Sequence, residues 1–207
     1  MEMRFLKPMF YVLAYSLAAV GTVHAMGPKP RPDTSPAAQA YTWYDDGHER
    51  PVWRDSGMVA EFDPPAKETS AVSRAYTGAS VVRGGRGNVR LWSVGKGNAD
   101  STLQSARAIQ PTAKVSPVFR DTPGAGGRIR ALPGNVIVTF RPDWTEAQVR
   151  AWAKGRGLEL VRPLNVNNAW VIRTEPGTAA LDLANTLHRS GEVVAATPYW
   201  WVEVTKR

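Results

Sequence analysis

In the second half of the chain, the spacing of the apolar positions alternates between the strand and the helix period. Asn135-Val-Ile-Val-Thr-Phe140 is typical of a strand, and Thr145 with Gln148 three residues later predicts a capping box that opens a helix ended by Gly157. Two strand-like runs, a second apolar helical stripe and a last strand from Val193 follow. The pattern predicts the order βαββαβ. The later elements are residues 158–164, the turn at residues 165–168, residues 169–174 and the stripe Ala180, Leu183, Ala184 and Leu187.

The first half can be divided in the same order. A hairpin that turns at Asp46-Gly47 precedes the first unit. Two pairs of segments correspond between the halves: Val59-Ala-Glu-Phe62 with Ile137-Val-Thr-Phe140, and Ser116-Pro-Val-Phe119 with Thr197-Pro-Tyr-Trp200. We therefore expect an α+β protein of two tandem ferredoxin-like (βαββαβ) units with antiparallel sheets, the first unit preceded by a β-hairpin. The alternative is that this order is imposed on an unrelated α+β chain. The expected elements of the first half are strands at 58–62, 79–83, 88–94 and 114–119, and helices at 66–76 and 100–109.

The strands of the second unit are apolar on both faces. Val136, Val138 and Phe140 alternate with Ile137, so one set points to each side of the sheet. One face is expected to pack against the two helices. The other requires the sister unit or a binding partner, because a large exposed apolar sheet face favours association.

The N-terminal residues have the pattern of an export signal. Arg4 and Lys7 precede an apolar run that ends in the small-x-small sequence Val23-His24-Ala25, which predicts cleavage after Ala25 and a periplasmic or secreted protein without a membrane anchor. A retained anchor is the alternative. The expected division of the chain is a signal peptide at 1–25, a flexible Pro-rich lead-in at 26–40, the hairpin and first unit at 41–120, a Gly/Pro linker at 121–134, the second unit at 135–201 and an extended tail at 202–207.

Composition limits how such a protein can be stabilised and what it can bind. The 207 residues include no cysteine, so an exported fold depends on its core rather than on disulfides. The net charge is +8 and the calculated pI is about 10.0, yet the basic residues are scattered, with Arg83-Gly-Gly-Arg86 the densest group. We do not expect nucleic-acid binding. Binding of envelope polyanions stays open as an alternative and would weaken steeply with salt.

The sequence lacks the residue sets that common catalytic and metal sites require. Its histidines are His24, His48 and His188, and no nucleophile elbow, zinc motif or calcium loop is present. Arg54-Asp55-Ser56-Gly57 resembles an Asp-Ser/Thr-Gly protease segment without its partner motifs, and we interpret it as a turn. Gly84-Gly-Arg-Gly87 is interpreted as a hairpin turn. We predict no enzyme activity, no cofactor and no metal site.

An ordered series of segments resembles the prodomain of subtilisin-like serine proteases. Ala131-Leu-Pro-Gly-Asn-Val-Ile-Val-Thr-Phe140 is similar to the start of that prodomain, residues 145–157 to its first helix, and residues 158–161 and 170–173 to its next strands. Residues 180–199 are similar to its closing helix and strand. Residues 41–62 resemble the N-terminal part of the fervidolysin-type prodomain.

The resemblance implies a function without catalysis. Such prodomains lay the open face of their sheet on the protease, and their C-terminal segment enters the active-site cleft as a product-like strand that inhibits the enzyme and assists its folding. Because no protease domain follows, the resemblance implies binding in trans, with a remnant of a protease prodomain as the alternative. The expected tail has Arg207, or a residue just before it, in the primary pocket, and a solvated tail is the alternative. The expected protease-binding residues are Trp201, Val202, Glu203, Val204, Thr205, Lys206 and Arg207.

Overall fold

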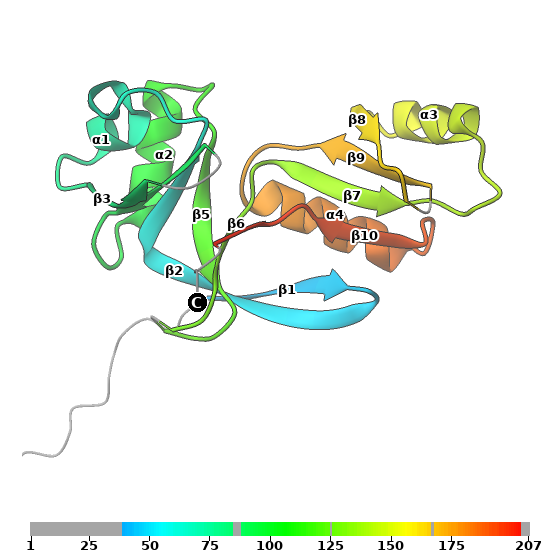
Figure 1. The fold of residues 1–207 in the computed structure, drawn as a ribbon, viewed down its shortest axis with the longest axis horizontal. Coiled ribbons are helices and arrows are strands. Elements are labelled where there is room, and N and C mark those ends of the chain that lie inside the picture. Colours follow the sequence, from blue (N-terminus) through cyan, green and yellow to red (C-terminus); the bar gives the residue numbers. More distant parts are fainter. Residues whose placement is uncertain (1–38, 85–87, 125, 167, 204–207) are drawn as a thin grey trace, which may run out of the picture. The chain divides into compact units, whose positions relative to one another are not determined.

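The computed structural model describes residues 39–84, 88–124, 126–166 and 168–203, and for residues 83 and 84 it describes the backbone alone. These residues form an α+β protein with two antiparallel sheets, as expected from the spacing of the apolar positions (Figure 1). The predicted signal peptide with its cleavage at Ala25, and nearly all of the lead-in, lie outside the described residues.

The predicted hairpin is present at the start of the described chain. Strands β1 (Ala40–Asp45) and β2 (His48–Phe62) are antiparallel and turn at Asp46 and Gly47, with φ of 49° and 77°. Positive φ at both central positions is the type I′ geometry that an Asp-Gly pair favours. This part of the sequence prediction is confirmed.

Strand β2 continues through the segment predicted to be a turn. Its pairing with β5 (Val115–Arg120) shifts between Asp55 and Val59, so Arg54-Asp55-Ser56-Gly57 forms a β-bulge within one strand of 15 residues. The Asp55 carboxylate accepts a hydrogen bond from the Gly57 amide at 3.0 Å and another from Arg120 Nε at 2.7 Å. The prediction of a turn was wrong, because the side chain of Asp55 supports the extra residues of a bulge instead.

The first sheet has the strand order β5-β2-β4-β3, with β3 at Ser80–Gly84 and β4 at Val89–Ser93. Helices α1 (Ala71–Ala75) and α2 (Ala99–Ile109) lie together beside this sheet (Figure 1). The single helix predicted over residues 66–76 is divided into a 3₁₀ turn, η1 (Lys67–Thr69), and the short α1. Part of Gly84-Gly-Arg-Gly87 lies outside the described residues.

Two further strands extend this sheet beyond β5. Strand β6 (Ile129–Ala131) pairs with β5, and the C-terminal strand β11 (Trp201–Val202) pairs with β6, so the order begins β11-β6-β5. Strand β6 lies in the segment predicted to be a linker, residues 121–134. That prediction missed it because three residues between Gly/Pro-rich turns are too short for a visible alternation.

The second sheet is formed by the second half, with the order β10-β7-β9-β8 and antiparallel pairing throughout. The predicted capping box is confirmed, because the Thr145 side chain accepts from the Gln148 amide and the Gln148 side chain accepts from the Thr145 amide. The second helix ends at Gly191 with φ of 67°. The elements are β7 (Asn135–Thr139), α3 (Glu146–Gly155), β8 (Leu160–Pro163), β9 (Ala169–Arg173), α4 (Thr178–Ser190) and β10 (Ala195–Pro198).

Alternate residues of the strands point into different cores. Val136, Val138 and Phe140 are buried with residues of α3 and α4, as predicted. In the first half, Val59 packs with residues of α1 and α2, whereas Phe62 belongs to a cluster on the opposite face of the sheet. Phe62 and Phe140 are therefore not equivalent in space. The sequence alignment of Phe62 with Phe140 is therefore shifted by an odd number of residues from the structural one, and such a shift exchanges the two faces of a strand.

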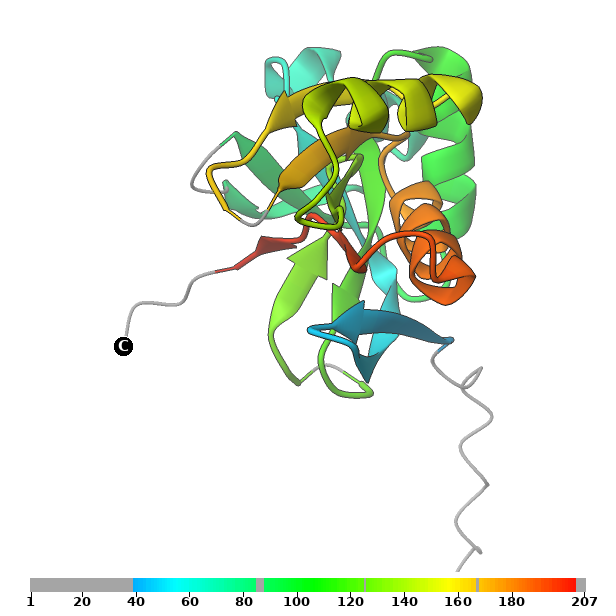
Figure 2. The same cartoon turned by 90° about the vertical axis from the view of Figure 1, so that its right-hand side faces the viewer.

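The hairpin joins the core of the second half. Trp43 and Val52 are buried in the same cluster as residues of α3, α4 and the second sheet. Asn185 Nδ2 on α4 donates to the Thr42 carbonyl at 2.7 Å, and Figure 2 shows the hairpin lying next to α4. The described residues belong to one compact unit, in which α1 and α2 keep a separate core.

Candidate protein-binding site

The predicted binding segment begins where the chain passes from one sheet to the other. Strand β10 is an edge strand of the second sheet, and the Tyr199 amide still donates to the Asn135 carbonyl at 3.0 Å. Two residues later Trp201 pairs with Ala131 of the first sheet. The C-terminal segment thus connects the edges of both sheets.

Trp201 and Val202 are not a free tail. Val202 is paired with Arg130 in β6, and the Glu203 amide donates to the Ile129 carbonyl at 2.9 Å. The Trp201 side chain is half-buried against the apolar cluster that contains Phe62. The predicted division at residue 202 needs correction, because β6 offers a sheet edge on which the chain continues as a strand. Val204, Thr205, Lys206 and Arg207 lie outside the described residues.

A cluster of aromatic side chains supports this segment. Trp200 packs edge-on against Trp43, with ring centroids 5.6 Å apart, and against Phe119 at 5.5 Å. The guanidinium of Arg130 lies 5.4 Å from the Trp43 ring centroid and 5.8 Å from that of Trp200. Asp121 balances its charge, because Arg130 Nη2 lies 3.3 Å from Asp121 Oδ2. These contacts hold the start of the C-terminal segment in a defined direction.

The outer edge of β11 has the geometry of a strand-addition site. Strand β11 stands at the end of the strand order, with β6 as its neighbour within the part of the chain that the structure describes. An edge strand presents main-chain donors and acceptors to an extended peptide from another protein. The outer edge of β11 is therefore the candidate contact for an extended peptide.

The face of the second sheet away from α3 and α4 is moderately apolar. Ile137 and Ala195 are half-buried, and Tyr199 next to them is 42% exposed. By the alternation along β7 and β10 these residues share a face with Thr139 and Asn135. The face combines apolar contact with hydrogen-bonding groups, a composition common in protein interfaces.

The two described histidines have structural contacts. His48 is exposed in the hairpin, and its Nδ1 lies 3.0 Å from the Asp46 carbonyl oxygen. His188 stacks on Tyr44 with ring centroids 3.9 Å apart, a contact between α4 and the hairpin that was not predicted from the sequence. No group of three metal-ligating side chains occurs among residues 39–203 as far as they are described.

Comparisons of the chain with protein-family models, with curated proteins and with solved structures found no match. None of the described helices is long and apolar enough to cross a membrane.

Proposed function

We propose that this protein is an exported, non-catalytic partner of a subtilisin-like serine protease, which it inhibits or helps to fold in the manner of a propeptide. We further propose that each half is a ferredoxin-like unit. The strand orders β5-β2-β4-β3 and β10-β7-β9-β8 support this, because each is the 4-1-3-2 order of a βαββαβ unit with antiparallel neighbours.

The observation that carries the proposed function is the extended C-terminal strand at a sheet edge. Trp201 and Val202 are paired with β6, and Val204 to Arg207 follow them in the sequence, outside the described residues. In the proposed complex these last residues add to an edge strand of the protease cleft, with alternate side chains in its subsites. Arg207, or Lys206 before it, occupies the primary pocket, so a protease that cleaves after basic residues is the preferred partner.

The corrected boundary determines how the proposal is tested. A protein that ends at Glu203 keeps β11 and loses the inserted residues, whereas a protein that ends at Trp200 also loses the pairing with β6. Both are compared with the full chain for inhibition of purified subtilisin-like proteases of basic and of apolar specificity. Thermal unfolding of each variant is followed by circular dichroism.

The expected result is a rise of at least about tenfold in the inhibition constant when residues 204–207 are removed, with an unchanged melting temperature. Removal of residues 201–207 lowers the melting temperature as well. Equal inhibition by the chain that ends at Glu203 contradicts the insertion of the tail. Lack of inhibition by the full chain across the protease panel, together with no effect on protease refolding, contradicts the proposed function.

A further inference from the structure

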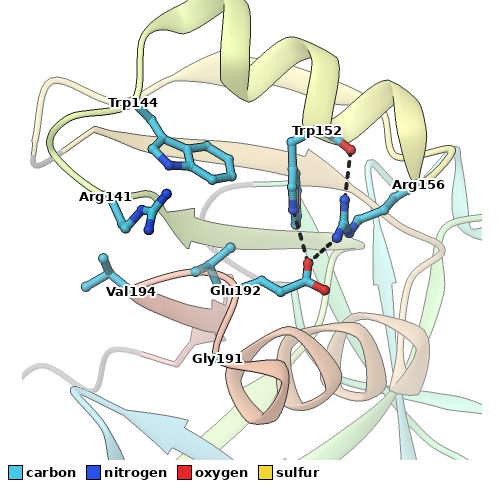
Figure 3. A pocket seen from close by; sticks show the side chains of 8 residues that line it. Arg141, Trp144, Trp152, Arg156, Gly191, Glu192 and Val194 are labelled. Carbon is cyan, nitrogen blue, oxygen red and sulfur yellow. Dashed lines mark hydrogen bonds and ion pairs between the residues drawn. The ribbon is translucent and has the colours of Figure 1, made fainter.

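A cleft of about 510 Å³ opens beside α3, and none of its lining residues belongs to the C-terminal strand β11. The loop that follows β7 forms one side of the cleft, and the turn that follows α4 forms another (Figure 3). Its volume is within the range of small-molecule sites in proteins. The lining residues are Arg141, Trp144, Trp152, Arg156, Gly191, Glu192, Val193 and Val194.

Two arginines in the cleft are stacked on two tryptophans. The guanidinium carbon of Arg156 lies 4.6 Å from the Trp152 ring centroid, and that of Arg141 lies 5.3 Å from the Trp144 ring centroid. A guanidinium held on an aromatic face keeps its N–H groups in its own plane, where they are available to a carboxylate. Stacking therefore orients the donors before a ligand binds.

The charges in the cleft are unequal. Glu192 Oε2 accepts from Trp152 Nε1 at 3.2 Å and forms an ion pair with Arg156, so these two charges balance each other. Arg141 Nε lies 3.7 Å from Asp143 Oδ1, and both side chains are more than half exposed. An exposed ion pair of this kind holds Arg141 only weakly. In Figure 3, Arg141 lies beside Trp144, and Trp152, Arg156 and Glu192 form a separate group. The side of the cleft at Arg141 suits an anion.

The remaining wall is apolar. Val194 is 57% exposed although it is a large aliphatic side chain, and the neighbouring Val193 is buried. Trp144 is half-buried and stacks on Phe140 with ring centroids 5.5 Å apart. A ligand body that covers Val194 and the exposed part of Trp144 would remove apolar surface from water.

The walls are held by hydrogen bonds from outside the cleft. The side-chain amide of Asn168 donates to the carbonyls of Arg141 and Trp144, each at 3.0 Å, and thereby fixes the loop that carries both residues. On the other side, Gly191 ends α4 with φ of 67°, and the Glu192 amide donates to Ser190 Oγ at 3.3 Å. The cleft is thus preformed by the fold, and binding requires little ordering of the protein.

We propose that this cleft binds an apolar carboxylate, meaning a carboxyl group carried on an aromatic or aliphatic body. Arg141 takes the carboxylate, and the body lies on Trp144 and Val194. The same chemistry is offered by the last residue of a peptide and by a free arylalkanoic acid. This inference is independent of the proposed protease partner, because it uses none of the residues from Trp201 onward.

The test compares ligands that differ in the carboxyl group alone. N-acetyl-Leu-Phe and its C-terminal amide are titrated into the full protein by calorimetry, with 3-phenylpropionate as the free acid, and the Trp152 indole N–H is followed by NMR. We expect the peptide acid to bind at least about tenfold more tightly than the amide. If the peptide acid binds more tightly than 3-phenylpropionate, the site prefers chain ends. If the peptide acid and 3-phenylpropionate bind equally, the site recognises the carboxyl group and its apolar body without the rest of a peptide.

Two arginine variants provide the matched control. Arg141→Gln removes the guanidinium proposed to bind the ligand carboxylate. Arg150→Gln removes an arginine that does not line the cleft, stacks on Trp170 at 5.2 Å and pairs with Glu146. Arg141→Gln is expected to weaken binding of the acid at least about tenfold, and Arg150→Gln to leave it unchanged. Circular dichroism verifies that both variants fold. Equal binding of acid and amide, equal effects of the two variants, or no binding at millimolar ligand would overturn the proposal.

Discussion

The two halves of the molecule share a strand order and differ in how their first helices are held. Helix α3 has ten residues and carries its own capping box, so the local sequence supplies its start. Helix α1 has five residues, too few to be stable without tertiary contacts. Its N-cap, Ser70, is buried, and its hydroxyl both accepts from the Val72 amide and donates to Glu61 in the neighbouring strand.

The contacts between sheet and first helix also differ, being apolar in the second half and partly polar in the first. Against α3, Phe140 packs edge-on to Trp152 with ring centroids 5.0 Å apart, a purely aromatic contact. Against α1, the carboxylate of Glu61 is 2% exposed and also accepts from Trp92 Nε1 at 2.9 Å. A buried carboxylate with several donors specifies one arrangement of its neighbours, whereas apolar contacts are less directional. A short helix can thus replace a longer one when a polar group in the sheet holds its first turn.

Removal of the buried carboxylate of Glu61 is the test of this comparison with the largest expected effect on stability. Glu61→Ala leaves Ser70 Oγ and Trp92 Nε1 without their acceptor, so we expect a loss of about 3 kcal/mol in the free energy of unfolding. Urea denaturation measures it. The control is Glu159→Ala, which breaks an exposed pair with Arg173 and is expected to cost less than about 0.5 kcal/mol. Similar losses in both variants would show that the Glu61 network does not stabilise the first half.

The second test compares the two N-caps. Thr145→Ala removes an exposed cap and is expected to cost about 1 kcal/mol, whereas Ser70→Ala removes a buried cap that also binds Glu61 and is expected to cost about 2 kcal/mol. Denaturant unfolding of the two variants under the same conditions gives the difference. A cost for Thr145→Ala equal to or above that for Ser70→Ala would contradict the dependence of α1 on the sheet.

The smallest expected effect is a pH-dependent contribution of Asp63, directly after β2, to the stability of the fold. A hydrogen bond from Lys114 Nζ, at 2.8 Å, lowers the pKa of Asp63 below its ordinary value, and partial burial opposes this. A depressed pKa contributes stability above the pKa of the unfolded chain, about 3.9, and this is lost as pH falls through the lower folded value.

Solvent screens this pair, because both side chains are more than half exposed. Asp63→Asn is therefore expected to destabilise the protein by less than about 0.5 kcal/mol at neutral pH. Thermal unfolding of both proteins is measured from neutral pH down into the acid range, and the difference is expected to shrink as Asp63 becomes protonated. A difference of the same size at both ends of the range would assign the effect to something other than the charge of Asp63.

Features encoded by neighbouring residues were predicted from the sequence. These are the order of strands and helices in both halves, the Asp46-Gly47 hairpin, and the capping box of Thr145. Each depends on residues a few positions apart, whose spacing and turn chemistry are visible in one segment. The helix-facing residues of β7 were also predicted, because alternation along a strand assigns faces once the core side is known.

Tertiary structure decided the features that join distant segments. Strand β11 joins a sheet because β6, some 70 residues earlier, offers it an edge, and no local signal shows which edge an extended segment will join. The face of Phe62, the buried partners of Glu61, and the cleft between the loop at Arg141 and the turn at Glu192 depend on packing in the same way. Apart from β6, β11 and the division of the first helix, the sequence alone determined which elements form, because propensity and capping act locally. Which edges and faces meet was decided by long-range contacts, which a reading of adjacent residues does not contain.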